Sequence, residues 1–410
     1  MDYLHTQNQT YDCIIIGGGI SGISFAHKLS RLGKTILILE KDRQAGGQIQ
    51  TYTTATYPDF WVEMGAHTCY NSYTHLLSML FEAGLKDEIR SVDKCSYMLS
   101  TEKGIKSMFS QISCLSLMLR GMKIFFSSKT GKSVKEYFRP ILGKKNYDKL
   151  FSKMFRAVIC QQADDYPAQF FLKKRKDRFN EMPRKFSFNG GLASMINAII
   201  TQDKLSVLTS TEVTGITYKE KTYQIQTSGG QLYEARNIAL ATNPQVSAQI
   251  LKDLAPDISR LFKTIPLSYS DTLNVIIEKE KLDLKPVAGI ISTSDEFMSA
   301  VSRDVIKHPQ LRSFSFHFIK DGKNKDEQLA LVCRVLNIQK KDIVSHAFTT
   351  HILPSPHKEH TSIANQIEAI RKNDRIFFLG NYYYGLSLED CVHRSNDEFE
   401  RYKRIFNKGK

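Results

Sequence analysis

Residues Tyr11–Glu40 read YDCIIIGGGISGISFAHKLSRLGKTILILE, and the architecture expected for the whole chain follows from them. The apolar run Cys13–Ile16 predicts a buried strand, and Ile20–Leu32 has the pattern of a helix. A second apolar run, Thr35–Leu39, ends on the acid Glu40. This order predicts the strand–helix–strand unit of a Rossmann-type α/β domain.

The glycines between the first strand and the helix form the dinucleotide fingerprint Gly17-x-Gly19-x-x-Gly22. Gly17 permits a sharp turn, Gly19 lets the backbone approach a pyrophosphate, and Gly22 lets the helix pack closely on the sheet. Free N–H groups at the helix N-terminus would bind the phosphates. Glu40 lies where its carboxylate can accept hydrogen bonds from both hydroxyls of an adenosine ribose. A glycine-rich turn without a ligand is the alternative, but it leaves the second strand and its terminal acid unexplained.

The residues after Glu40 resemble the second glycine loop of the superfamily of FAD-containing amine oxidases, phytoene desaturases and protoporphyrinogen oxidases. Arg43, Gly46, Gly47 and Thr51 carry this resemblance. It implies FAD as the cofactor, with the paired glycines against its ribityl–phosphate region and a cation near the diphosphate. The residues expected to bind FAD in this part of the chain are Gly17, Gly18, Gly19, Ile20, Ser21, Gly22, Glu40, Lys41, Arg43, Gly46, Gly47 and Gln48.

The segment Phe60–His67 (FWVEMGAH) resembles the loop that runs under the isoalloxazine ring in this superfamily. The resemblance implies that Met64, Gly65, Ala66 and His67 contact the flavin. His67 is the candidate side chain on the substrate side. A histidine on a surface loop is the equal alternative.

Composition narrows the class of protein. The chain has 410 residues, 41% of them hydrophobic, and a net charge of +15, so two or more domains are expected. No nucleic-acid motif accompanies the charge, which leaves solubility, an anionic membrane surface or an acidic substrate as explanations.

Seven scattered cysteines without a CxxC pair argue against a zinc site and suit a reducing cytoplasm. The N-terminal residues lack the features of a signal peptide, and no apolar stretch is long enough to span a membrane. We expect a cytoplasmic protein that binds neither a metal ion nor nucleic acid.

Residues Thr101–Asp177 are rich in Met, Phe, Leu, Lys and Ser, which predicts several amphipathic helices. The apolar side would carry Met108, Phe109, Ile112, Leu115, Leu119, Met122, Ile124 and Phe125. Such basic helices can lie at an anionic membrane surface or can simply pack against one another. The segment resembles the helical insert of protoporphyrinogen oxidases, which implies a wall of the substrate cavity and a peripheral membrane contact.

Further flavin contacts are implied near the C-terminus. Arg375–Cys391 (RIFFLGNYYYGLSLEDC) resembles the closing motif of protoporphyrinogen oxidases. In that family, residues matching Gly380 lie by the diphosphate, and those matching Leu386, Ser387 and Leu388 lie by the pyrimidine end of the flavin. The backbone of Val213 is expected at the adenine edge. Cys391 is expected to be a packed residue rather than a covalent flavin link.

The predicted fold class is α/β, a Rossmann-type FAD-binding domain with a mixed-sheet substrate domain and a helical insert. The expected parts are residues 1–75, 186–250 and 366–410 for the FAD domain, 76–185 for the insert with part of the substrate domain, and 251–365 for the substrate sheet.

The resemblance implies an FAD-dependent oxidoreductase of haem biosynthesis. It would dehydrogenate protoporphyrinogen IX or coproporphyrinogen III by hydride transfer to flavin N5. The alternatives are a flavin amine oxidase, a carotenoid-type desaturase, a UDP-galactopyranose mutase-like flavoenzyme and a non-catalytic flavin-binding scaffold. No catalytic side chain is assigned in the substrate sheet, where the polar residues that could reach a cavity are Asp271, Arg303, His308, Arg312 and His317.

Overall fold

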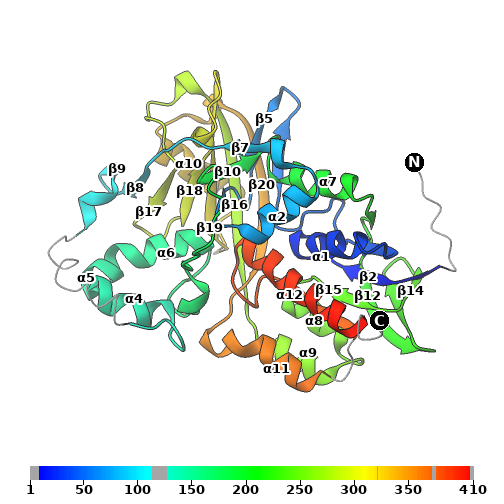
Figure 1. The fold of residues 1–410 in the computed structure, drawn as a ribbon. Coiled ribbons are helices and arrows are strands. Elements are labelled where there is room, and N and C mark those ends of the chain that lie inside the picture. The colour runs from blue at the N-terminus through cyan, green and yellow to red at the C-terminus, as the bar shows by residue number, and fades with distance from the viewer. Residues whose placement is uncertain (1–8, 113–126, 321, 372–374, 407–410) are drawn as a thin grey trace.

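The computed structural model describes residues 9–112, 127–320, 322–371 and 375–406 (Figure 1). Its centre is a five-stranded parallel sheet assembled from three distant parts of the chain. The strand order is β11 (Ser206–Leu208), β3 (Ile36–Leu39), β2 (Cys13–Ile16), β15 (Ile238–Leu240) and β21 (Ile376–Phe378). Strands β2, β3, β15 and β21 are buried throughout, as expected for a parallel sheet covered on both faces.

Helices cover one face of this sheet. The helix α1 (Ile20–Ser30) packs against α12 (Leu388–Phe406), the red helix in Figure 1, and both contribute to one apolar core. A hydrogen bond from Ser395 Oγ to Ser21 O, 2.8 Å long, ties these two helices together. The helices α2 (Thr74–Glu82) and α7 (Leu192–Gln202) complete this core.

A second core lies on the opposite face of the parallel sheet. It is formed by a four-stranded sheet and three helices. These elements are β1 (Thr10–Tyr11), β14 (Leu232–Ala235), β13 (Thr222–Thr227), β12 (Val213–Lys219), α8 (Pro244–Leu251), α9 (Pro256–Lys263) and α11 (Ile363–Ile370).

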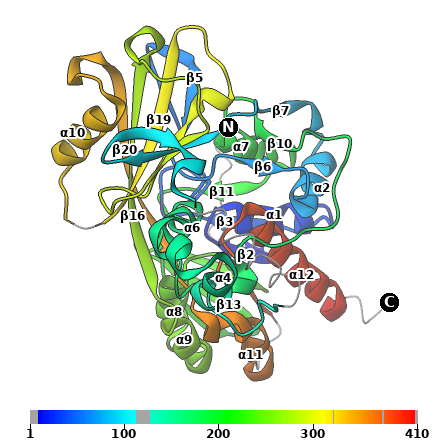
Figure 2. The same cartoon turned by 90° about the vertical axis from the view of Figure 1, so that its left-hand side faces the viewer.

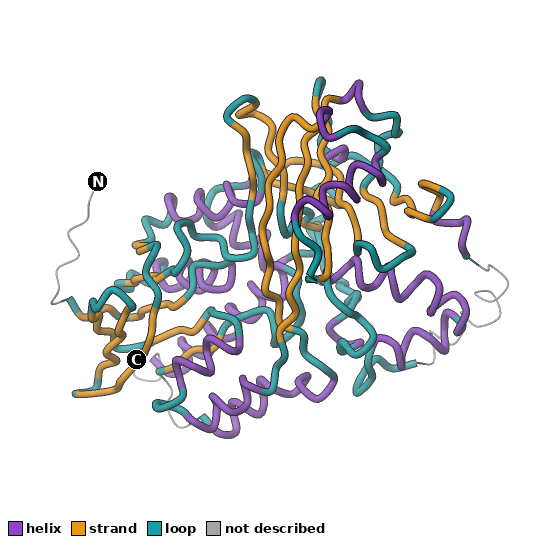
Figure 3. Tube along the Cα trace, turned by 180° about the vertical axis from the view of Figure 1, so that it is seen from behind, coloured by secondary structure: helices purple, strands orange, loops and turns teal. Residues whose placement is uncertain are grey.

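A second large sheet corresponds to the predicted substrate sheet, and we keep that name for it. It has seven strands and is mixed, because β17 and β8 pair in parallel while its other pairs are antiparallel. Its order is β20 (Ile343–Pro354), β16 (Leu267–Glu278), β19 (Leu311–Ile319), β18 (Ser299–Ser302), β17 (Gly289–Ser292), β8 (Tyr97–Thr101) and β9 (Gly104–Ser107). Helix α10 (Lys325–Leu336) packs on this sheet. Figure 2 shows β16 running down from the sheet toward α8 and α9, and Figure 3 shows the upright strands between the helical parts.

The helical insert has an aromatic core of its own and lies beside the substrate sheet (Figure 1). It consists of α4 (Val134–Leu142), α5 (Lys144–Asn146), the π-helical turn η4 (Tyr147–Phe151) and α6 (Ser152–Ile159). Ser133 and Glu136 form a capping box that starts α4. The amphipathic stretch expected at Leu115, Leu119, Met122, Ile124 and Phe125 lies outside the described residues.

The remaining elements are short connections around these layers. They are β4 (Thr51–Thr54), β5 (Tyr57–Glu63), β6 (Cys69–Tyr70), β7 (Ile89–Ser91), β10 (Lys185–Phe188), and the 3₁₀ turns η1 (Lys86–Glu88), η2 (Met108–Gln111), η5 (Ala168–Phe170), η6 (Lys279–Lys281), η7 (Arg303–Val305), η8 (Lys340–Asp342) and η9 (Lys358–Ser362). Across the part of the chain that is described, no helix has the length and apolar character needed to cross a membrane.

The predicted fold class is confirmed, and several element boundaries were wrong. Apolar residues at helical spacing, from Leu76 to Leu85, predict one helix over Ser72–Val92. The helix stops at Glu82, because Gly84 turns the chain with φ +71° and Ile89–Ser91 then pairs with β10. The sequence VLTSTEVT predicts one strand over Val207–Thr214. This segment instead belongs to two strands in different sheets, separated by Ser210 with φ +50°. The predicted helical region also begins with strand β9, which forms a hairpin with β8.

Candidate active site

A cavity of about 1400 Å³ lies where the parallel sheet, the substrate sheet and the helical insert meet. Four separate segments of the chain bring their predicted flavin-contacting residues to it. Those that line it are Gly17, Gly19, Ile20, Ser21, Glu40, Lys41, Arg43, Gly46, Gly47, Gln48, Met64, Gly65, Ala66, His67, Val213, Gly380, Leu386, Ser387 and Leu388. Of the predicted set, only Gly18 and Gly22 do not line the cavity.

The glycine fingerprint has the close contacts that its residue type requires. Gly17 has φ +104°, and a Cβ on it would lie 2.7 Å from Ala241 O. A Cβ on Gly22 would lie 2.1 Å from Gly17 O, so Gly22 serves the packing of α1 on the sheet. No side chain caps the N-terminus of α1 at Gly19. Its N–H groups are therefore available to a diphosphate.

Glu40 is buried at the end of β3, with 5% of its surface exposed. Its Oε2 accepts a hydrogen bond from Gly18 N at 2.7 Å, and its Oε1 accepts one from Asp42 N at 2.9 Å. Each carboxylate oxygen keeps a second lone pair for a ribose hydroxyl. Glu40 thus also orders the glycine loop, a role that the sequence did not indicate.

The two flavin loops pack backbone against backbone. Gly19 and Gly46 form an isolated β-bridge, and a Cβ on Gly47 would lie 3.2 Å from Gly19 Cα. A Cβ on Gly65 would lie 2.3 Å from Gln48 O, so only glycine fits there. These contacts leave a backbone-lined floor that suits the long, flat FAD molecule.

Three histidines from different elements line the same cavity: His67, His317 and His351. Burial lowers the pKa of His67 to about 4 and that of His317 to about 3, and it also lowers the pKa of His351. His67 Nδ1 lies 2.9 Å from Thr68 Oγ1, and His317 Nδ1 lies 2.8 Å from Thr272 Oγ1. At neutral pH His67 and His317 are therefore uncharged hydrogen-bonding groups.

His351 was missed by the sequence reasoning, although it connects both flavin loops. Its Nδ1 lies 2.7 Å from Gln48 Oε1, and its Nε2 lies 2.8 Å from Met64 O. The neighbouring Thr349 donates to Gln50 Oε1 at 2.9 Å. Alternating polar residues in β20 were the available signal, because side chains two apart share one face of a strand.

The other polar candidates lie elsewhere. Arg312 pairs with Asp304 inside the substrate sheet, and Asp271 accepts hydrogen bonds from Thr350 and Gln328. Arg303 and His308 line a separate pocket.

The insert supplies the wall that faces β20. Its apolar members at the cavity are Ala157, Val158, Ile159, Tyr166, Phe170, Phe171 and Leu172. Lys173 Nζ and Arg175 Nη2 both bond to Asp390 Oδ1, at 2.8 and 3.0 Å. Ser387 Oγ donates to the other oxygen of Asp390 at 2.6 Å. The insert is thereby joined to the N-terminus of α12, where the flavin's pyrimidine end is expected.

The C-terminal motif contributes structure as well as residues that are predicted to contact the flavin. Cys391 is buried, and burial raises the pKa of its thiol to about 12, which suits a packed residue. Glu389 reaches α2, where its oxygens accept hydrogen bonds from His75 N and Leu76 N, both at 3.0 Å. A neighbouring helix thus caps α2, whose own N-cap residue makes no side-chain hydrogen bond.

Curated relatives match only short segments. The "Inactive all-trans-retinol 13,14-reductase" of Danio rerio is 55% identical over 42 residues, which is 10% of this chain and 7% of that protein. The (S)-6-hydroxynicotine oxidase of Paenarthrobacter nicotinovorans is 38% identical over 55 residues, 13% of each chain. The chain thus covers only a small part of the length of these relatives.

Solved structures match over nearly the whole chain. "Putative protoporphyrinogen oxidase" from Exiguobacterium sp. 255-15 has a TM-score of 0.77 at 16% identity, over 97% of this chain and 99% of that one. Cyclohexylamine oxidase from Brevibacterium oxydans IH-35A has a TM-score of 0.73 at 15% identity, over 98% and 100%. A fatty acid isomerase from P. acnes that produces CLA has a TM-score of 0.72 at 15% identity, over 97% and 99%. These likenesses establish the fold.

The family is established by a match along the sequence. The model of the family described as flavin containing amine oxidoreductase matches residues 20–393 of the 410. Together with the glycine cradle and the uncapped helix N-terminus, this match shows that the chain belongs to the flavin containing amine oxidoreductase family and uses FAD.

Proposed function

We propose that this protein is an FAD-dependent oxidoreductase that dehydrogenates a porphyrinogen, either protoporphyrinogen IX or coproporphyrinogen III. The observation that carries the proposal is the charge of the cavity beside the wall that the insert forms. There the insert supplies an apolar wall together with Lys173 and Arg175, and the acid beside them, Asp390, is shared by both cations. A large apolar substrate with carboxylates fits this environment.

Lys173 and Arg175 keep free donors for a substrate carboxylate. The lysine ammonium has three N–H donors and the guanidinium has five, and the contacts with Asp390 and Ser387 use only some of them. Two cations against one carboxylate leave a net positive edge. A protonated amine is repelled by that edge, which favours the porphyrinogen over an amine.

The chemistry needs orientation more than a strong base. Bound FAD would supply the acceptor for the hydride, one proton with two electrons, that leaves the substrate carbon. The chain's own part is to hold the macrocycle between β20 and the insert, and to offer His67 and His317 as uncharged hydrogen-bonding groups.

The test is anaerobic mixing of the yellow holoenzyme with candidate substrates while flavin absorbance is followed. We expect bleaching by a porphyrinogen. If amines or a carotenoid precursor bleach the flavin and porphyrinogens do not, the protein has the corresponding amine oxidase or desaturase activity instead. If UDP-galactopyranose binds only after the flavin has been reduced, a UDP-galactopyranose mutase-like activity is favoured. A retained flavin that no substrate bleaches would indicate a scaffold.

A pair of variants tests the assignment of the cations. Lys173→Gln is expected to raise the KM for the porphyrinogen about tenfold, because a charge-assisted contact is worth about 1.5–3 kcal/mol. Lys174→Gln is the matched control, because Lys174 is exposed and does not line the cavity. Equal KM values in both variants would remove Lys173 from the substrate site.

We also propose a peripheral contact with anionic membranes at the cavity's outer edge. Val158 and Leu172 line the cavity yet expose 57% and 54% of their surface. Lys174 and Lys176 are exposed next to Leu172. Apolar side chains bordered by lysines are typical of surfaces that rest on acidic lipid headgroups.

Sedimentation with vesicles tests this contact. Binding to phosphatidylserine vesicles at low salt is expected to weaken in a double variant, Val158→Ser with Leu172→Ser. Leu32→Ser is the control, because Leu32 is 46% exposed on α1's following turn and does not line the cavity. The contact is refuted if the unaltered protein does not sediment with the vesicles at low salt and also does not sediment at moderate salt.

A further inference from the structure

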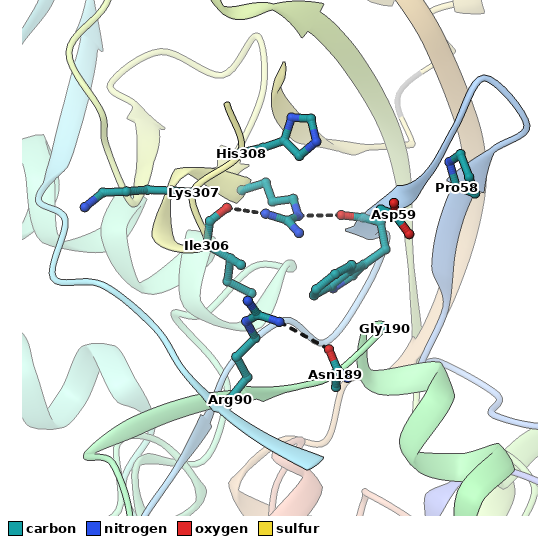
Figure 4. Close-up of a pocket in the computed structure, with 10 residues that line it drawn as sticks. Pro58, Asp59, Arg90, Asn189, Gly190, Ile306, Lys307 and His308 are labelled. Carbon is teal, nitrogen blue, oxygen red and sulfur yellow. Dashed lines mark hydrogen bonds between the residues drawn. The ribbon is translucent and has the colours of Figure 1, made fainter. Parts of the chain in front are cut away.

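A second pocket, of about 460 Å³, lies apart from the flavin cavity and shares no lining residue with it. It is formed by β5, β7, the turn before α7 and the segment that begins with η7 (Figure 4). Its lining residues are Pro58, Asp59, Trp61, Arg90, Asn189, Gly190, Arg303, Ile306, Lys307 and His308.

Arg303 is held rigidly at the centre of this pocket. Its Nε donates to Trp61 O at 2.6 Å, and its Nη1 donates to Ile306 O. The guanidinium carbon lies 4.3 Å from the centre of the Trp61 ring and 4.8 Å from that of Phe60. Burial, with the nearby Arg90, lowers the pKa of Arg303 to about 10, so it stays charged at neutral pH. Its remaining N–H donors are fixed in place before any ligand arrives.

Arg90 brings a second guanidinium to the pocket from β7. Its Nη1 donates to Asn189 Oδ1 at 3.2 Å, a bond that Figure 4 shows orienting the side chain. Within the described residues, neither Arg90 nor Arg303 forms an ion pair. The carboxyl of Glu63 attracts Arg303 without forming an ion pair with it in the described part of the chain, and burial raises the pKa of that carboxyl to about 7. The two guanidiniums repel each other, so positive charge remains in excess here.

The other charged groups do not remove this excess. Lys307 Nζ lies 3.0 Å from Asp93 Oδ2, so that cation already has a partner. Asp59 is the one acidic side chain among the lining residues. His308 Nδ1 accepts hydrogen bonds from Leu311 N at 3.0 Å and Gln310 N at 3.3 Å. In the neutral ring the proton is therefore on Nε2, which makes that atom a further donor.

We propose that this pocket binds a small oxyanion, a phosphate or a carboxylate, between the guanidiniums of Arg90 and Arg303. Guanidinium forks match the paired oxygens of both groups. Asn189 orients one arginine, and the carbonyls of Trp61 and Ile306 orient the other. Because β5 continues from Trp61 to Glu63 and the flavin loop, a ligand here contacts the strand that supports the cofactor.

The chain carries its own reporter for this site. Trp61 is the only tryptophan in the sequence, and Arg303 packs on its ring. The FAD-saturated protein is titrated with inorganic phosphate in one series and with citrate in another, while tryptophan fluorescence is recorded. Sodium chloride at matched ionic strength is the control. Equilibrium dialysis with labelled phosphate or citrate gives a second reading, which does not depend on fluorescence.

A saturable response to phosphate or to citrate is expected, and the series that responds identifies the source of the oxyanion. Arg90→Gln is expected to weaken binding about tenfold through the loss of one charge-assisted contact. Arg404→Gln is the matched control, since Arg404 is exposed on the last turn of α12 and outside the pocket. No saturable binding of either anion by both readings, or equal affinity in Arg90→Gln and the unaltered protein, would overturn the proposal.

Discussion

Glu63 is a partly buried residue at the junction of β5 and the flavin loop. Its Oε1 accepts a hydrogen bond from Leu192 N and its Oε2 accepts one from Thr51 Oγ1, both at 2.8 Å. Burial raises the pKa of Glu63 from its ordinary 4.5 to about 7. The folded state thus binds this proton more tightly than the unfolded state does, so the stabilisation is full below pH 4.5 and is lost as the pH rises through about 7.

Glu63→Gln is expected to remove that loss. The difference amounts to about 3 kcal/mol at alkaline pH, by the conversion of about 1.4 kcal/mol per pKa unit. Melting temperatures measured from about pH 4 to pH 9 should show the variant gaining on the unaltered protein as the pH rises. Asp59→Asn, an exposed carboxyl on the same strand, should follow the unaltered curve. Parallel curves for Glu63→Gln and the unaltered protein would contradict the assignment.

His351 is a positioning residue, because it joins the Gln48 side chain to the Met64 carbonyl across the two flavin loops. In the neutral ring Nε2 donates to the Met64 carbonyl, and Nδ1 can only accept, which requires the Gln48 amide to turn its NH₂ group toward it. Each of these hydrogen bonds is worth about 1 kcal/mol. His351→Leu is therefore expected to weaken FAD binding about tenfold or more, with His351→Gln recovering part of the loss. FAD affinity is measured by titrating the apoprotein. His346→Leu, an exposed site on the same strand, should bind FAD normally. If His351→Leu binds FAD with unchanged affinity, the position of the two flavin loops does not depend on β20.

At the scale of elements, Glu389 shows how one helix can complete another. It lies in the first turn of α12, and its carboxylate takes the place of an N-cap for α2. Glu389→Gln is expected to destabilise the protein by about 1–2 kcal/mol, the usual cost of a lost helix cap. Urea unfolding measures this change. Glu400→Gln on the same helix, paired only with Lys403 at the surface, should stay within about 0.5 kcal/mol of the unaltered protein. If Glu389→Gln lowers the free energy of unfolding by no more than Glu400→Gln does, Glu389 does not act as the cap of α2.

Elements with strong local signals were predictable, and those that depend on distant partners were not. The fingerprint at Gly17–Gly22 was predictable because its glycine spacing is a local pattern, although the close contact of Gly17 is with the distant Ala241 O. By contrast, the short strand β7 exists through pairing with β10, and the separation of β11 from β12 follows from their pairing in different sheets. Local sequence reports neither of these. His351 was missed for the same reason, since its two partners are about 300 residues away, at Gln48 and Met64.

The whole molecule depends on how the helical insert is fastened to the substrate sheet, because the cavity lies between them. Arg156 of α6 is 3% exposed, and it donates to Asp295 Oδ1 at 2.6 Å and to Ser294 O at 3.0 Å. Lys153 bonds the same carboxylate at 2.5 Å. Both cations hold the pKa of Asp295 below its usual range. The insert is therefore fastened by one buried arginine and one lysine that lies nearer the solvent.

Arg156→Met is expected to loosen the insert without unfolding the parallel sheet. The loss of hydrogen bonds from a buried charged group corresponds to about 1.5–3 kcal/mol. Hydrogen exchange should show that loss of protection in α4 and α6, while β2 and β15 exchange as before. The KM for the substrate that the holoenzyme oxidises should rise as well, since α6 forms a cavity wall. Lys153→Met keeps the arginine and should cost less than about 1 kcal/mol. Equal protection of the insert in Arg156→Met and Lys153→Met would mean that other contacts hold it, and the cavity wall would then not depend on this ion pair.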